Sequence, residues 1–193
     1  MKKKLLSFAA ALCFIVGAKA QTSYGIKAGV NFPKMTFSME GISASNNAST
    51  SFYVGGYIDA PIATNLSVQP GLSLQGKGGK YDEQKTSLMY LELPVNFVYY
   101  VPAGSGNIFL GAGPYAGYAL SGKVKEDGQS MDIEFGDEGM KRFDAGLNFL
   151  AGYKLSNGFL INGGYSLGIV DLGGFEGASL KNRVFSVGIG YQF

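Results

Sequence analysis

The sequence predicts an all-β protein, an eight-stranded antiparallel transmembrane β-barrel with short periplasmic turns and longer extracellular loops. Apolar residues alternate with glycine or polar residues in eight segments, which is the period of β-strands. The connections between these segments alternate between long and short. Glycine accounts for 30 of the 193 residues and aromatic residues for 13%, a composition typical of many strands and tight turns.

The first twenty residues have the pattern of a secretory signal peptide. Three lysines precede an apolar stretch from Leu5 to Ala18, and Ala18 and Ala20 form an A-x-A cleavage site before Gln21. The apolar stretch is shorter than the roughly 20 residues that a membrane-spanning helix needs. We therefore expect residues 1–20 to direct export through the Sec pathway and to be removed.

Removal of the signal peptide changes which chemistry the chain can perform. The remaining domain, residues 21–193, has 12 basic and 14 acidic side chains, so no nucleic-acid partner is expected. Cys13 is the only cysteine, and Leu12 is too large for the residue that precedes a lipoprotein cysteine. Histidine is absent, which removes the usual general base and the commonest metal ligand. No catalytic residue, metal or cofactor is expected, and the protein is predicted not to be an enzyme.

The eight predicted strands follow one another along the whole domain. In segment 24–32 the even-numbered residues are apolar and alternate with glycine, lysine and asparagine. Segment 51–60 is a strand with an ambiguous apolar side, because Tyr53 and Tyr57 compete with the even-numbered apolar residues. Even-numbered residues form the apolar face of two further segments, 66–75 and 108–118. Odd-numbered residues form it in the other four, which are 91–99, 143–153, 159–168 and 185–193.

The connections predict the orientation of the barrel. The long polar connections are 33–50, 78–87, 122–142 and 170–182, and the short turns are 61–64, 102–106 and 155–158. Membrane barrels have short turns on the periplasmic side and long loops outside. Closure is expected because lipid cannot hydrogen-bond an open sheet edge. Carboxylates at 81–85 and 134–142 could bind a metal, but we interpret them as parts of solvated loops.

Aromatic residues predict two girdles at the ends of the strands, where rings prefer the headgroup level. The periplasmic girdle would contain Tyr24, Tyr99, Tyr100, Phe109, Tyr153, Phe159, Tyr191 and Phe193. The extracellular girdle would contain Phe32, Phe52, Tyr90, Tyr118 and Phe143. The last strand also resembles the C-terminal signal by which the barrel-assembly machinery recognises outer-membrane proteins. The residues of this assembly signal would be Ser186, Gly188, Tyr191 and Phe193.

Three prolines, Pro70, Pro94 and Pro114, lie inside predicted strands. Each removes a donor from the hydrogen-bond ladder, and proline is usually confined to sheet edges or bulges. A closed barrel has no edge, so we expect bulges or irregular pairing beside these residues.

Six motifs resemble the PorT-like outer-membrane β-barrel family of Gram-negative bacteria. They are VQPGLSLQGKGGKY (68–81), YLELPVNFVYY (90–100), FLGAGPYAGY (109–118), FDAGLNFLAGYKLSNG (143–158), GGYSLGIVDL (163–172) and KNRVFSVGIGYQF (181–193). The resemblance covers most of the domain in order. It implies an outer-membrane barrel scaffold without a catalytic signature, and PorT itself is implied in a secretion system for outer-membrane cargo.

Charged residues on the predicted inner face are the candidates for a functional site. The predicted lumen charge cluster consists of Lys27, Asp59, Lys77, Glu92 and Asp144, with Arg183 near one rim. Exchangeable ion pairs could form a gate for a small solute. We favour a plugged interior, because an eight-stranded barrel is just wide enough to be filled by side chains and buried charges persist when they are paired.

We favour a non-enzymatic outer-membrane barrel that acts through its surface loops or as a component of an envelope or secretion assembly. One alternative is a narrow channel for small solutes or ions. Others are a lipid-modifying enzyme, which the missing histidine opposes, and a soluble lipocalin-like barrel with the apolar faces turned inward. The expected partners are outer-membrane lipid, the barrel-assembly machinery and other envelope proteins.

Overall fold

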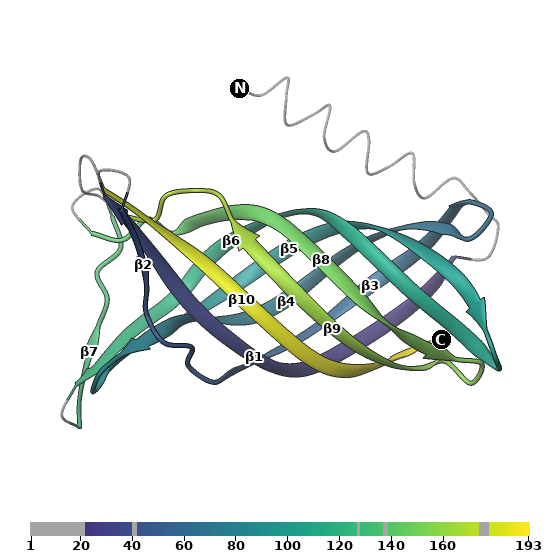
Figure 1. The fold of residues 1–193 in the computed structure, drawn as a ribbon, viewed down its shortest axis with the longest axis horizontal. Coiled ribbons are helices and arrows are strands. Elements are labelled where there is room, and N and C mark those ends of the chain that lie inside the picture. Colours follow the sequence, from purple (N-terminus) through teal and green to yellow (C-terminus); the bar gives the residue numbers. More distant parts are fainter. Residues whose placement is uncertain (1–21, 40–41, 127, 137–138, 174–177) are drawn as a thin grey trace, which may run out of the picture.

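Eight long strands form one closed antiparallel barrel in the computed structural model (Figure 1), which describes residues 22–39, 42–126, 128–136, 139–173 and 178–193. The strands of the ring are β1 (Ser23–Met39), β3 (Ser51–Ala63), β4 (Leu66–Tyr81), β5 (Gln84–Ala103), β6 (Gly106–Glu126), β8 (Phe143–Leu155), β9 (Phe159–Gly168) and β10 (Ala178–Gln192). All eight predicted strands are confirmed. The predicted signal peptide, with Ala18 and Ala20, lies outside the described residues.

The ring closes between its first and last strands. Ring neighbours follow chain order, and β1 pairs with β10 from Gly25 opposite Gln192 to Met39 opposite Ala178. The amide of Phe193 adds a further hydrogen bond to the carbonyl of Tyr24, at 2.8 Å. Because the seam is continuous, the ring strands satisfy one another's backbone groups, as a membrane-spanning sheet requires.

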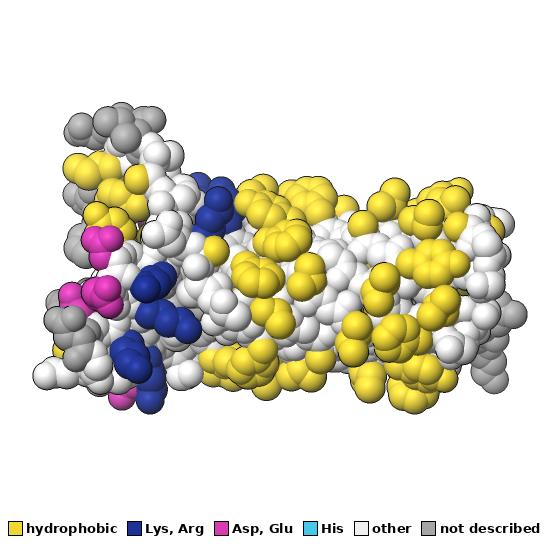
Figure 2. Space-filling model, turned by 60° about the horizontal axis from the view of Figure 1, so that its bottom comes forward, with side chains coloured by type: hydrophobic (Ala, Val, Ile, Leu, Met, Phe, Trp, Pro, Cys, Tyr) yellow, Lys and Arg dark blue, Asp and Glu magenta, His cyan; other side chains and the backbone are white. Residues whose placement is uncertain are grey.

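The outer surface of the barrel is apolar. Figure 2 shows a broad belt of hydrophobic side chains across the visible face of the barrel. In β3, Phe52, Val54 and Ile58 are exposed, whereas Tyr53 and Tyr57 are buried inside, which resolves the ambiguity of this strand. A water-soluble protein rarely exposes so large an apolar area. The belt therefore faces hydrocarbon, and the inverted, lipocalin-like arrangement is wrong.

Three of the predicted girdle residues point into the barrel instead of outward. Tyr90 is fully buried and Phe109 is 6% exposed. Tyr90 packs against an apolar layer inside the barrel, and Phe109 packs with Tyr100 in a second layer. Tyr100 and Phe109 lie near strand ends as predicted, whereas Tyr90 lies well inside β5, which begins at Gln84. Tyr90 and Phe109 face inward because their sequence neighbours Leu91 and Leu110 face outward.

The two ends of the barrel differ in a way that the sequence predicted only in part. The three short turns are confirmed, and each leaves only two or three residues between strands. At the other end, predicted loop 78–87 is a hairpin in which β4 and β5 continue to a turn at Asp82 and Glu83. Two short strands, β2 (Ile42–Ser45) and β7 (Gln129–Asp132), pair with β1 and β6 outside the ring. Polar residues pair as strands there because both faces lie beyond the lipid.

Strand pairing is interrupted beside the internal prolines. The β4–β5 ladder stops at Pro70 and resumes at Ser73, and the β5–β6 ladder stops at Pro94 and resumes at Phe97. Pro114 lies in the β6 stretch opposite this second interruption. The register is the same on both sides of each gap, so irregular pairing occurs without a bulge. The register shifts of the barrel lie at Pro61/Ala63 and Met89/Tyr90.

The second interruption makes Gly113 a sensitive position. A Cβ atom at Gly113 would overlap the carbonyl oxygen of Val95 on β5, whereas a Cβ at the outward-facing Gly56 would meet its nearest neighbour, the carbonyl oxygen of Gly25, at 3.6 Å. We expect Gly113→Ala to lower the free energy of unfolding by about 1–3 kcal/mol, the usual cost of overpacking. Gly56→Ala should have little effect. Urea titrations read by the heat-dependent mobility of the folded barrel in gels test this, and equal midpoints would contradict it.

Candidate functional site

Three charged side chains meet in the lumen of the barrel. The ammonium of Lys77 on β4 lies 2.7 Å from a carboxylate oxygen of Glu92 on β5 and 3.0 Å from one of Asp144 on β8. All three side chains are at most 2% exposed. We call these residues the central triad.

Strand register explains why these residues meet. Glu92, Gly117 and Asp144 are direct ladder neighbours across β5, β6 and β8. The glycine between the two carboxylates has no side chain, so the ammonium of Lys77 can lie between them. Alternation turns each residue inward, and the register between the strands brings them to the same level.

Polar and aromatic groups complete the surroundings of the central triad. Asn182 donates a hydrogen bond to Asp144 at 3.0 Å, and the hydroxyl of Tyr115 donates to the same carboxylate at 3.4 Å. The ammonium of Lys77 also lies 4.2 Å from the ring centroid of Tyr115, a distance at which cation–π attraction operates. Each charge is thus paired with an opposite charge, and Lys77 and Asp144 are also hydrogen-bonded, which are the conditions that favour burial.

Asp59 belongs to a separate network near the periplasmic turns. Its carboxylate accepts hydrogen bonds from the hydroxyl of Tyr100 at 2.6 Å and from the amide of Gln192 at 2.9 Å. Gln69 donates to Tyr100, and Lys154 donates to Gln192. The structure therefore brings together three of the five predicted lumen charges and places Asp59 elsewhere.

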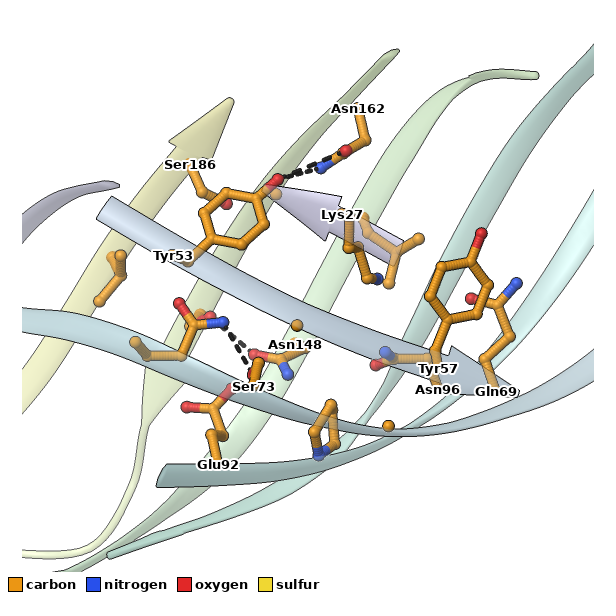
Figure 3. Close-up of a pocket in the computed structure, with 18 of the residues that line it drawn as sticks. Lys27, Tyr53, Tyr57, Gln69, Ser73, Glu92, Asn96, Asn148, Asn162 and Ser186 are labelled. Carbon is orange, nitrogen blue, oxygen red and sulfur yellow. Dashed lines mark hydrogen bonds between the residues drawn. The ribbon is translucent and has the colours of Figure 1, made fainter. Parts of the chain in front are cut away.

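Lys27 lies between the two networks, beside a small cavity. Figure 3 shows Lys27 among inward side chains that include Tyr57, Asn96 and Asn162. The ammonium of Lys27 lies 4.8 Å from the ring centroid of Tyr57. The cavity holds about 70 Å³ of free space, far less than the roughly 300–1,000 Å³ of ligand pockets. It has room for a few water molecules.

The inward tyrosines and amides were missed by the sequence prediction. Tyr53, for example, accepts a hydrogen bond from Asn162 across the lumen at 2.9 Å (Figure 3), and Asn31 donates to Gln75 at 2.9 Å. Each of these residues lies at an inward position of its strand. Strand alternation could have identified them, because every residue that alternates with lipid-facing apolar residues must face the lumen.

An apolar layer closes the lumen above the central triad. It consists of four buried residues, Met35, Leu88, Tyr90 and Ala119. Four partly buried residues from the extracellular end pack against it, namely Ile133, Phe135, Met140 and Leu180. This layer separates the polar interior from the extracellular space.

A wide apolar cavity lies above this layer, and we call it the extracellular cup. Its free volume is about 500 Å³. Its lining residues are Met35, Phe37, Ala44, Ser45, Asn46, Tyr81, Thr86, Val124, Ile133, Met140 and Leu180. The sequence prediction missed the cup because all of these residues lie in segments interpreted as loops.

Asp171 fixes one wall of the extracellular cup. Its carboxylate accepts the backbone N–H of Leu180 at 2.7 Å and that of Gly173 at 3.0 Å, and it lies 3.5 Å from the ammonium of Lys141. Partial burial alone would raise the pKa of this carboxyl. The two backbone donors and the Lys141 charge outweigh burial and hold the pKa below its ordinary value. The carboxylate therefore stays ionised and anchors the start of β10.

The residues of the predicted assembly signal lie on both faces of β10. Tyr191 and Phe193 of the predicted assembly signal are exposed on the outer face, with ring centroids 5.1 Å apart. Ser186 lines the small cavity inside, and Gly188 pairs with Gly29 of β1. Within the described residues, no group of three or more acidic, histidine or cysteine side chains could hold a metal ion. Asp137 and Glu138 of the predicted carboxylate loop lie outside that part of the chain.

Within the described residues, no helix is long and apolar enough to span a bilayer.

Solved structures share the barrel fold at low sequence identity. Neisserial surface protein A is 14% identical, covers 90% of this chain and 100% of its own, and superposes with a TM-score of 0.50. The attachment invasion locus protein of Yersinia pestis, Ail, is 15% identical with the same coverages and a TM-score of 0.48. OprG of Pseudomonas aeruginosa is 14% identical, covers 89% of this chain and 95% of its own, and has a TM-score of 0.49.

Sequence comparison supplies the family. No curated protein matches the chain significantly. The profile of the outer membrane protein beta-barrel domain family matches residues 19–173, which is most of the sequence and includes β1 to β9. Together with the closed eight-stranded ring and its apolar outer belt, this match shows that the chain belongs to the outer membrane protein beta-barrel domain family.

Proposed function

We propose that this outer-membrane protein is a non-enzymatic surface-binding barrel with a sealed lumen, which binds an apolar aromatic group in its extracellular cup. The observation that supports this most directly is the position of the cup, which opens outward above a filled interior. The cup volume of about 500 Å³ falls in the range of small-molecule sites. Two methionines and two aromatic residues in its lining suit an aromatic ligand, because thioether sulfur and aromatic rings attract one another.

The same surface fits the expectation that the protein joins an envelope or secretion assembly, as its resemblance to the PorT-like family suggests. An apolar side chain of a partner protein would fill the cup as well as a small molecule would. We also infer that the protein is exported through the Sec pathway and that Tyr191 and Phe193 are read by the barrel-assembly machinery. The lipid-facing exposure of both rings supports this inference.

The alternative of a narrow channel conflicts with the filled lumen. A solute would have to pass the central triad and then the apolar layer formed by Met35, Leu88, Tyr90 and Ala119. Opening this path would separate buried charges from their partners, which costs several kcal/mol. We therefore propose that the lumen charges stabilise the barrel and do not conduct.

Substitution of Lys77 tests whether the lumen charges stabilise the barrel. Lys77→Met leaves the carboxylates of Glu92 and Asp144 buried without their cation, so we expect the free energy of unfolding to fall by about 3–5 kcal/mol. The triple variant Lys77→Met/Glu92→Gln/Asp144→Asn should recover much of the loss. Lys141→Met, which removes the exposed pair with Asp171, should cost less than about 1 kcal/mol. Urea unfolding of the refolded barrel gives the stabilities.

Conductance measurements distinguish a permanently filled lumen from a gated channel. In planar bilayers we expect the wild type and Glu92→Gln to give currents at the level of the protein-free membrane. A Glu92→Gln barrel that conducts while it remains as stable as the wild type would contradict the plug and favour the channel.

Methyl NMR tests ligand binding in the extracellular cup. With methionine methyl groups labelled in nanodiscs, titration of 2-naphthol should shift the Met35 and Met140 signals saturably, because both residues line the cup. Met89, which is absent from the lining, should respond only in proportion to naphthol dissolved in lipid. Leu180→Asp places a carboxylate in the cup and should abolish saturation. Met131→Asp, an exposed residue of β7, serves as control, and unsaturable shifts throughout would refute the proposal.

A further inference from the structure

Basic side chains form two rows on the outer face of the barrel, just beyond the apolar belt. Figure 2 shows Lys and Arg gathered between the hydrophobic belt and the acidic extracellular tips. In the first row, Lys80 of β4 is the direct ladder partner of Lys85 of β5, and Lys85 is the partner of Lys125 of β6. In the second, Lys34 of β1 is the partner of Arg183 of β10.

Strand alternation places both rows outside the barrel. Tyr81, Thr86 and Val124 line the extracellular cup, so their sequence neighbours Lys80, Lys85 and Lys125 point to the opposite face. In the second row, Lys34 and Arg183 follow the exposed pair Phe32 and Phe185 by two residues each. Those two rings stack with centroids 6.2 Å apart.

Such rows are electrostatically unfavourable on their own. Cβ atoms of directly opposed residues in antiparallel strands lie about 4.5–5.5 Å apart, and like charges at such positions destabilise the sheet. Within the described residues, the ion pairs at this end join Lys123 to Asp132 and Lys141 to Asp171, and neither involves a row. The other contacts of the rows are to neutral carbonyls, such as that from Lys85 to Thr50 at 3.3 Å. An anion between the opposed cations would remove the repulsion.

The depth of the second row identifies the anion, and the first row faces outward at the same end of the barrel. Residues two positions beyond Phe32 and Phe185 lie about 7 Å farther along the strands, and aromatic girdles mark the headgroup level. Phosphate groups of lipids occupy this plane. The rows lie on opposite sides of the ring, because β5 is separated from the β1–β10 seam by β4 and β3 in one direction and by β6, β8 and β9 in the other. We propose that the two rows bind the phosphate groups of anionic lipids in the outer leaflet, at two positions around the barrel.

A pair of charge-matched variants tests this proposal on the full-length barrel. Lys85→Gln/Lys125→Gln dismantles the first row, whereas Lys141→Gln/Lys181→Gln removes two cations from the same end without touching the first row, because Lys181 lies on β10, across the ring from β5. Both variants and the wild type are reconstituted in phosphatidylcholine nanodiscs, with and without bisphosphorylated lipid A. Thermal unfolding is followed by the heat-dependent gel mobility of the barrel.

The proposal predicts a reversal of the order of stability between the two membranes. In phosphatidylcholine alone, the row variant should melt several degrees above the wild type, because it lacks the opposed charges. In lipid A, the wild type and the control variant should gain melting temperature, and the row variant should gain little. Lys85→Arg/Lys125→Arg keeps the charges and should gain like the wild type, which guards against a folding defect in the glutamine variant.

Two results would overturn the proposal. An equal gain in lipid A for the wild type and the row variant would show that the row does not bind lipid phosphate. A gain of the same size on adding inorganic phosphate to phosphatidylcholine nanodiscs would assign the row to a soluble anion and not to a lipid.

Discussion

The hydrogen-bonded seam between β1 and β10 is the constraint on which the rest of this structure depends. Lipid offers no hydrogen bonds, so a sheet in a membrane must pair its last strand with its first. That pairing runs for fifteen consecutive residue pairs here and fixes the ring at eight strands. The number of strands then fixes the diameter, and the diameter decides that the interior is filled by side chains. Closure at the seam thus requires a lumen filled by side chains, whichever residues face inward.

The filling of the lumen follows from alternation under this constraint. The apolar residues of each strand face the lipid, so the residues that alternate with them face the interior. In this chain the inward residues are mostly glycines, amides and tyrosines, with a few charged residues. Glycines allow close approach where bulky tyrosines cross the lumen. Lys77 is stabilised in the interior by two carboxylates, and Asp59 by two hydrogen-bond donors. Interior polarity is therefore a consequence of the outward apolar belt, and its organisation into paired networks keeps the barrel stable and closed.

Much of this architecture could be predicted from the sequence, because its main determinants are periodic. The eight strands, the short turns and the outward faces of seven strands follow from period-two patterns. Three-dimensional neighbours did not follow, because the patterns do not give the stagger between strands. That is why Asp59 was grouped with Lys77, although the register places them in different layers of the lumen. Segment 78–87 was interpreted as a loop because polarity alone does not separate a loop from a hairpin that stands in water.

The two lysines of segment 76–80 show how depth and face together determine what a residue does. Lys77 and Lys80 are three residues apart on one strand, so they point to opposite faces. Lys77 lies inside, where only fixed partners can satisfy it, and it is held by Glu92 and Asp144. Lys80 lies outside, beyond the apolar belt and opposite another lysine, where a fixed partner would be unnecessary if the membrane supplied the anion. The permanent ion pairs of Lys77 help to close the lumen. An exchangeable ion pair between Lys80 and a lipid phosphate would hold the barrel at a set depth in the outer leaflet. Face and depth, which sequence composition does not contain, assign the two lysines their different roles.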